Sequence, residues 1–119
     1  MTNFSTSHSN LDAQGEQINA LHRLVNWCLR HQGGSTFPII DFLLGMYNGH
    51  IWRPDMQLLS GRIDDEHFDD VIKVMRLYRF NRLEPHTFFE NGDEVFRALA
   101  SLTKRVKLVS NSAGKRSRT

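Results

Sequence analysis

The chain has 119 residues with eight phenylalanines and two tryptophans, and 39% of it is hydrophobic. This composition suits one packed domain and excludes a wholly disordered chain. Fifteen basic against thirteen acidic residues leave a formal charge of +2, too little to indicate nucleic-acid binding from net charge alone. A single cysteine excludes an internal disulfide and supplies no zinc ligand set, so a reducing compartment is expected, the cytoplasm by default.

No segment has the pattern of a leader or a membrane span. The first ten residues lack the basic start and the apolar run of a signal peptide. The longest apolar run, residues 37–40, is far shorter than the ~20 residues that cross a bilayer. We therefore expect neither export nor membrane insertion.

Residues 1–11 are rich in serine, asparagine and threonine and have little to bury, which predicts a flexible tail. Beyond them, apolar residues recur every three or four positions and predict an amphipathic helix over residues 12–31, ended by Gly33 and Gly34. The buried stripe of this helix consists of Ile18, Leu21, Leu24, Val25, Cys28 and Leu29.

A second helix is predicted over residues 36–48, and it is apolar on most of its circumference. Ser35 is placed to cap its start, and Pro38 lies in the first turn, where a missing N–H costs little. Asn48-Gly49 predicts a left-handed stop at its end. Because Asp41 is the only charge in the segment, this helix is expected at the centre of the fold.

Residues 50–63 are less regular. Pro54-Asp55 favours a short helix through Leu58 and Leu59, which Ser60-Gly61 closes. If Trp52 and Met56 in this segment are both exposed, an apolar contact surface there becomes more plausible than a charged one.

The clearest helix start in the chain is Asp64, which Asp65 and Glu66 follow in the first turn, where carboxylates oppose the positive end of the helix dipole. This pattern predicts a helix over residues 65–80. Its expected buried face is Phe68, Val71, Ile72, Met75 and Leu77 or Tyr78.

The last third predicts one turn over residues 85–89 and a helix over residues 93–107, with a basic flexible tail over 109–119. No segment alternates with the period of a strand. We therefore predict an all-α, compact single-domain bundle of four to five helices, spanning residues 12–108.

On the second predicted helix, Pro38, Asp41, Gly45 and Asn48 share one stripe. One interpretation is structural: Asp41 reaches water or meets a fixed donor, and Gly45 lets another helix approach closely. The other is a small groove for a partner or ligand, with Asp41 at its floor. A single carboxylate without a matched acid, base or metal is a weak basis for catalysis.

The acidic run 64–70 gathers carboxylates and one imidazole on about a turn and a half of helix, and such oxygen ligands suit magnesium, calcium or manganese. However, Asp65 and Asp69 face one way, Asp70 pairs more naturally with Glu66 and Lys73, and no second carboxylate motif completes a site. We therefore favour helix capping and solvation, with an acidic patch that docks a basic partner as an alternative.

The sequence has no histidine metal motif, no cysteine in a reactive setting and no phosphate-binding loop. The six histidines form neither a His-x-x-x-His pair nor a His-Glu-x-x-His motif. Cys28 lies among apolar neighbours, where a thiol is unreactive. Gly33-Gly34-Ser35 lacks the strand and the lysine of a phosphate loop. No cofactor, metal or catalytic residue is therefore expected.

Two groups of basic residues indicate a possible contact with nucleic acid. Lys73, Arg76, Arg79 and Arg82 follow one another at a spacing of three, close to one line, and Lys115, Arg116 and Arg118 lie near the end of the chain. Together they would track a phosphate backbone, with Tyr78, Phe80 or Trp52 available to stack on bases. The alternative is a solvated helix face and a solubilising tail.

One series of motifs resembles a known family. The series consists of Ala20-Leu21, Arg23-Leu24, Gly34-Ser35, Asp41-Phe42-Leu43-Leu44, Asn48 and the Asp64-Asp65 helix start. It resembles a family of small uncharacterised bacterial proteins found mostly on plasmids and integrated mobile elements, over roughly residues 18–90. The resemblance implies an accessory role in a mobile element and supplies no catalytic residues.

The sequence therefore favours a non-enzymatic protein that binds another macromolecule, plausibly as an inhibitor or modulator of a host protein complex such as a defence system. Its expected protein contacts are Asp41, Trp52, Asp65, Glu66, Asp69 and Asp70. The alternative is a small nucleic-acid-binding regulator that uses the basic residues named above. An enzyme or a metal protein is a third hypothesis, and self-association stays open.

Overall fold

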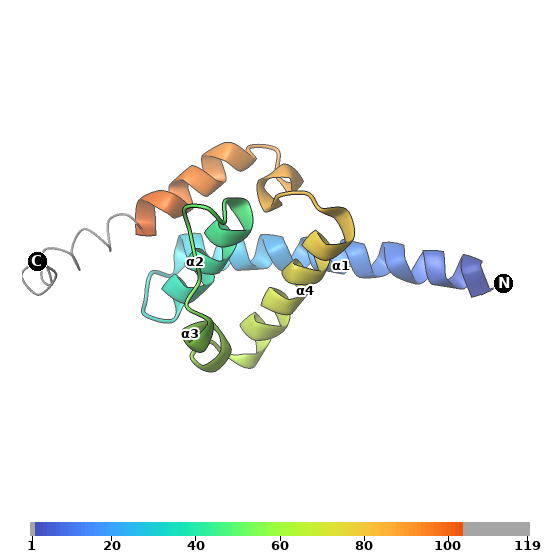
Figure 1. Ribbon diagram of the computed structural model, residues 1–119, viewed down its shortest axis with the longest axis horizontal. Helices are drawn as coiled ribbons and strands as arrows, with labels where there is room; N and C mark the ends of the chain where they lie inside the picture. The colour runs from blue at the N-terminus through green and yellow to red at the C-terminus, as the bar shows by residue number, and fades with distance from the viewer. Residues whose placement is uncertain (1, 104–119) are drawn as a thin grey trace, which may run out of the picture.

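The computed structural model describes residues 2–103, and the side chains of residues 12–103. The predicted tail over 109–119, with Lys115, Arg116 and Arg118, lies outside this range. Within it all regular structure is helical (Figure 1), which confirms the all-α prediction. These residues form five α-helices, within the predicted four to five, and one short 3-10 turn, η1. The elements are α1 (Thr2–Arg30), α2 (Thr36–Tyr47), α3 (Met56–Gly61), α4 (Asp65–Asn81), η1 (Pro85–Phe88) and a last helix over residues 92–103.

The first helix is longer than predicted. The backbone is helical from Thr2 onward, whereas the sequence placed the start at residue 12 and a flexible tail before it. No proline and no glycine occurs before Gly15, so nothing in this segment breaks a helix that the buried stripe farther along has already formed.

Helices α1 and α4 pack side by side and antiparallel. Gln14 Nε2 donates to Asn81 Oδ1 at 3.1 Å at one end of the pair, and Arg23 binds Asp70 nearer the other. Figure 1 shows α2 and α4 both lying against the long α1. The core therefore lies where these three helices meet.

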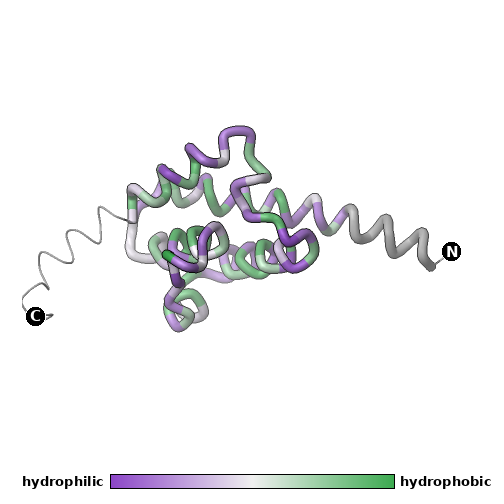
Figure 2. Tube along the Cα trace, turned by 45° about the horizontal axis from the view of Figure 1, so that its top comes forward, coloured by the Kyte–Doolittle hydropathy of each residue, from purple (hydrophilic) through white to green (hydrophobic). Residues whose placement is uncertain are grey.

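Helix α2 lies at the centre of the fold, as its apolar sequence predicted. Ile39, Ile40, Leu43 and Leu44 are fully buried, and η1 and α3 also contact α2. In Figure 2 hydrophobic and hydrophilic residues alternate along the other helices, which is typical of helices with one buried face.

The structure forms both ends of α2 differently from the prediction. Ser35 is the N-cap residue, but its backbone is helical and its side chain makes no capping bond; the N–H of Thr36 donates to the carbonyl oxygen of Gly33. The predicted left-handed stop is wrong, because Asn48 is extended, with φ −152°. Its side-chain Oδ1 instead accepts from the N–H of His50 at 3.1 Å, which turns the chain locally.

The short helix α3 is confirmed, and Asp55 caps it by accepting from the N–H groups of Gln57 and Leu58. Asp64 precedes α4 as predicted, but its side chain makes no capping bond. Asp64 Oδ1 lies 2.6 Å from His67 Nδ1 instead.

The buried face of α4 differs in part from the prediction. Val71 and Leu77 are buried as expected, and so is Val74, which the prediction omitted. Tyr78 is 38% exposed. The remaining predicted residues, Phe68, Ile72 and Met75, are half-buried at the edges of the stripe.

Arg82 ends α4 in the left-handed conformation, with φ 58°. The predicted turn follows as η1, whose first residue Pro85 is buried. The chain then enters the last helix at Gly92, which is also buried. His22 Nε2 on α1 donates to the carbonyl oxygen of Phe88 at 2.9 Å. This hydrogen bond connects η1 to α1.

Candidate functional site

A network of four charged side chains joins α1 to α4. Arg23 binds Asp70 with two nitrogens, at 3.0 Å from Nε and 2.9 Å from Nη2. Glu16 Oε2 accepts from Arg23 Nη2 at 2.7 Å and from Lys73 Nζ at 3.0 Å. Asp70, only 7% exposed, is therefore a structural carboxylate, and its partner is Arg23 rather than the Glu66 and Lys73 that the sequence suggested.

The network shifts the pKa values of Glu16 and Arg23. Hydrogen bonds from Arg23 and then Lys73 lower the pKa of Glu16 from 4.5 to about 2. Hydrogen bonds to Asp70 and Glu16 raise the pKa of Arg23 above its ordinary value. Both shifts favour the charged forms.

We expect part of the acid sensitivity of the fold to come from Glu16. A lowered native pKa stabilises the fold above pH 4.5, and this contribution is lost as the pH falls from 4.5 to about 2. NMR titration of the Glu16 carboxyl should give a midpoint near 2, and Lys73→Gln should raise it. Because the group is solvent-exposed, added salt should also raise it; a midpoint of 4.5 in both proteins would contradict the network.

The acidic run 64–70 keeps four exposed carboxylates, those of Asp64, Asp65, Glu66 and Asp69, and Asp64 is paired with His67. Glu66 and Asp69 line a shallow hollow of about 390 Å³. The charged network forms part of this hollow, so Arg23 and Lys73 offset some of its negative charge. The acidic surface is therefore smaller than the sequence suggested.

The predicted basic residues do not form one line. A spacing of three turns the side chain by about 60° around the helix at each step, which separates the ends of the series. Lys73 points to Glu16, and Arg82 donates from Nε to the carbonyl oxygen of Arg79 at 3.1 Å. Arg76 and Arg79 are exposed and line a hollow of about 310 Å³ together with Phe80, Ala13 and Gln17.

Asp41 is half-buried and faces the last helix, where its Oδ1 accepts from Thr103 Oγ1 at 3.5 Å. Gly45 on the same stripe permits a close approach, though by a loop rather than the predicted helix. A Cβ at Gly45 would lie 3.3 Å from the carbonyl oxygen of Trp52 and 3.2 Å from Cδ of Pro54. These contacts favour the structural interpretation of the stripe.

The segment between α2 and α4 exposes large apolar side chains. Ile51 is 68% exposed and Met56 57% exposed, and Leu58 is exposed as well. Trp52 is half-buried and packs against the core. The sequence made an apolar contact surface here conditional on the exposure of both Trp52 and Met56; Met56 is exposed, whereas Trp52 is half-buried.

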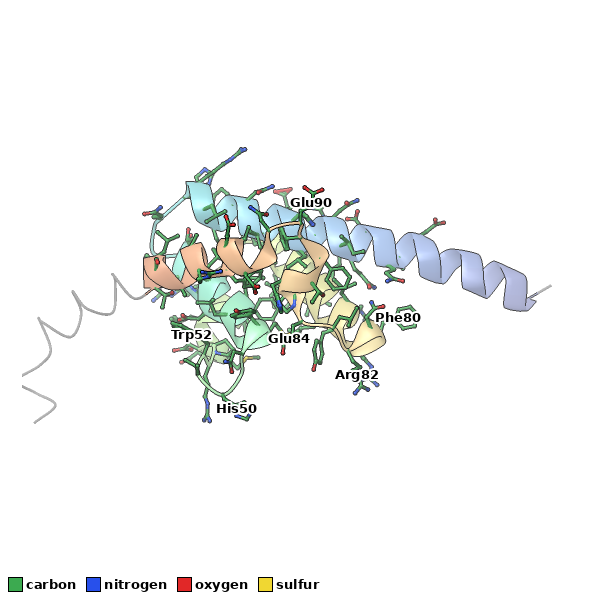
Figure 3. All side chains as sticks on the ribbon, turned by 90° about the horizontal axis from the view of Figure 1, so that it is seen from above. His50, Trp52, Phe80, Arg82, Glu84 and Glu90 are labelled. Carbon is green, nitrogen blue, oxygen red and sulfur yellow. The ribbon has the colours of Figure 1, made fainter. Side chains whose placement is uncertain are left out.

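The largest hollow that we describe is a groove of about 740 Å³ beside the C-terminal end of α2. Its lining comes from three parts of the chain: residues 45–50, Tyr78 on α4, and Glu84 with His86 around η1. Figure 3 shows His50, Glu84 and Arg82 on the side of the molecule away from Glu90. Gly45 and Asn48 of the predicted stripe line this groove, but Asp41 does not. Sequence reasoning missed Tyr78, Glu84 and His86, because no local pattern links them to α2.

Cys28 is fully buried, as predicted, and burial raises the pKa of its thiol to about 12. We expect iodoacetamide at pH 8 to leave the thiol unmodified in the native protein and to alkylate it completely in guanidinium chloride, because the thiolate is the nucleophile. Mass spectrometry reads both states, and rapid alkylation of the native protein would contradict the burial.

The described residues contain neither a metal-ligand cluster nor a membrane-spanning helix. Among residues 12–103, whose side chains are described, no three histidine, cysteine, aspartate or glutamate side chains form a group that could hold a metal ion. In the same part of the chain, no helix has both the length and the apolar character needed to cross a membrane.

These features define a small all-helical protein whose described surface carries exposed apolar side chains, an arginine pair and a polar groove. The chain belongs to the family of unknown function DUF7673, which matches residues 18–104. No curated protein and no solved structure matches the chain.

Proposed function

We propose that this protein is not an enzyme and acts by binding another protein. The observation that carries the proposal is the exposure of Ile51 and Met56, with Leu58, in one short stretch of chain. Large apolar side chains gathered on a surface are typical of contact sites. Trp52 packs against the core beneath this stretch, so the loop has a fixed support.

We also propose an accessory role on a mobile element, following the resemblance of the motifs between residues 20 and 65. The partner would then be a host protein complex such as a defence system, which this protein inhibits or modulates. The small size of the chain, 119 residues, suits a role performed by contact alone.

The test is purification from the native host followed by mass spectrometry of whatever remains bound. A double variant, Ile51→Ser with Met56→Ser, should lose the partner, because both side chains are exposed and their removal leaves the core intact. Glu90→Gln with Glu94→Gln changes two exposed residues outside the candidate contacts; this is the control and should retain the partner. Equal recovery with the wild type and the apolar double variant would disprove this contact surface.

A second candidate is nucleic-acid binding, which the hollow between Arg76, Arg79 and Phe80 favours. Phe80 is 57% exposed, so its ring is open to a base while the arginines meet phosphates. Fluorescence anisotropy with single-stranded DNA and RNA should show affinity that falls steeply with salt, and Arg76→Gln with Arg79→Gln should weaken it at least about tenfold. No binding at low salt would dismiss this candidate.

A further inference from the structure

Three separate features of the groove beside α2 favour the binding of a positively charged group. The first is Glu84, the only carboxylate in its lining, which contains neither lysine nor arginine. Arg82, two residues earlier, does not line the groove, and its guanidinium instead bonds back onto the carbonyl of Arg79. Among the described residues of the groove, the only ionisable base near Glu84 is therefore His86, whose Nδ1 lies 3.7 Å from Glu84 Oε1.

The second reason is the C-terminus of α2, whose last residues, 45–47, line the groove. The last carbonyl groups of a helix lack intrahelical partners and carry about half a negative charge together. A lysine, arginine or histidine in the last turn often offsets this charge, but α2 has no basic residue there. No basic residue in the last turn of α2 therefore offsets this charge.

The third reason is the pair of tyrosine rings in the lining, Tyr47 and Tyr78. Tyr47 is held in place, because the ring of His86 meets it edge-on at 4.9 Å and Phe96 lies 5.1 Å away. Tyr78 is 38% exposed. Aromatic faces attract cations, and arginine more often than lysine.

His86 adds an unused polar atom. Its Nδ1 is buried without a hydrogen-bond partner, and the Glu84 Oε1 atom lies 3.7 Å away, too far for a hydrogen bond. Its Nε2 is also 3.7 Å from Asp93 Oδ1. Glu84 is therefore near the imidazole and still able to accept hydrogen bonds from a ligand.

We infer that this groove binds the guanidinium group of an arginine side chain from the protein partner. The planar guanidinium stacks on aromatic rings and donates two parallel hydrogen bonds to a carboxylate, which matches Tyr47, Tyr78 and Glu84. The inference rests on the proposed function and specifies its partner: His50 in the lining directly precedes the exposed Ile51. The partner segment therefore carries an arginine beside apolar residues.

The test is NMR titration of the isotope-labelled full chain with N-acetyl-arginine amide at pH 8, where histidine is ordinarily neutral and does not oppose a cation. Saturable shifts are expected at Tyr47, Tyr78 and His86. N-acetyl-citrulline amide has nearly the same shape without the charge and should cause no saturable shift. Glu84→Gln should weaken arginine binding about tenfold, whereas Glu90→Gln, an exposed carboxylate on another side of the molecule (Figure 3), should leave it unchanged.

Equal shifts with the citrulline compound, or arginine binding unaffected by Glu84→Gln, would overturn the inference. Spermidine serves as a third ligand, and saturation at a hundredfold lower concentration than arginine would instead assign the groove to free polyamines. The titration uses no partner protein. Absence of arginine binding by the wild-type protein therefore refutes the groove alone, whereas unchanged partner recovery by the Ile51→Ser and Met56→Ser double variant refutes the proposed contact surface alone.

Discussion

Replacing Gly92 with alanine is expected to destabilise the fold by at least about 2 kcal/mol. A Cβ at this buried position would overlap the carbonyl oxygen of His86 and lie 2.7 Å from its carbonyl carbon. The obstacle is backbone rather than a flexible side chain, so η1 or the last helix must shift. Urea denaturation, followed by circular dichroism, measures the loss.

Gly15→Ala is the matched control, because nothing lies within 4 Å of a Cβ there. Gly15 is inside α1, where alanine is the better helix former by up to about 1 kcal/mol. The two glycine substitutions should therefore have opposite signs. A stable Gly92→Ala protein would mean that the entry to the last helix is looser than described.

Phe96→Ala is expected to cost about 3–5 kcal/mol, because the ring is fully buried and its loss leaves a large cavity. Phe96 lies against Tyr47 and Phe89, with ring centres 5.1 and 6.0 Å apart. It therefore joins the last helix to α2 and to Phe89, the residue that follows η1. Thermal and urea unfolding measure the effect.

Phe80→Ala makes the same chemical change on the surface, where Phe80 is 57% exposed, and should alter stability by less than about 0.5 kcal/mol. Phe96→Leu keeps most of the buried volume and should retain a folded protein in which the support of Tyr47 is weakened. Similar losses for the two alanine variants would contradict the assignment of Phe96 to the core.

The sequence predicted helices well where a buried stripe was long and regular. The apolar body of α2 predicted its place at the centre, and the Asp55 cap marked α3. Cap details were less predictable. The side chain of Ser35 or Asn48 has several local bonding choices, and contacts made by the rest of the fold decide among them.

The candidate sites were harder to predict because their partners are distant in sequence. Arg23 and Asp70 are 47 positions apart, and no spacing rule links them, so Asp70 was interpreted as an acidic contact when it is a buried ion-pair partner. The groove at Glu84 depends on how η1 folds back toward the end of α2. The half-burial of Trp52 was likewise decided by packing, because Trp52 lies against the core and its carbonyl group lies beside Gly45 of α2.

The antiparallel pairing of α1 with α4 has a consequence for synthesis in the cell. Ribosomes add about 5–20 residues per second, so Asp70 is made roughly 2–10 s after Arg23, which lies 47 positions earlier. During that interval α1 has been synthesised but its main packing partner has not, and α2 is the helix made before α4 that its apolar stripe contacts in the folded chain. Chaperones can therefore bind α1 in the nascent chain before α4 packs against it.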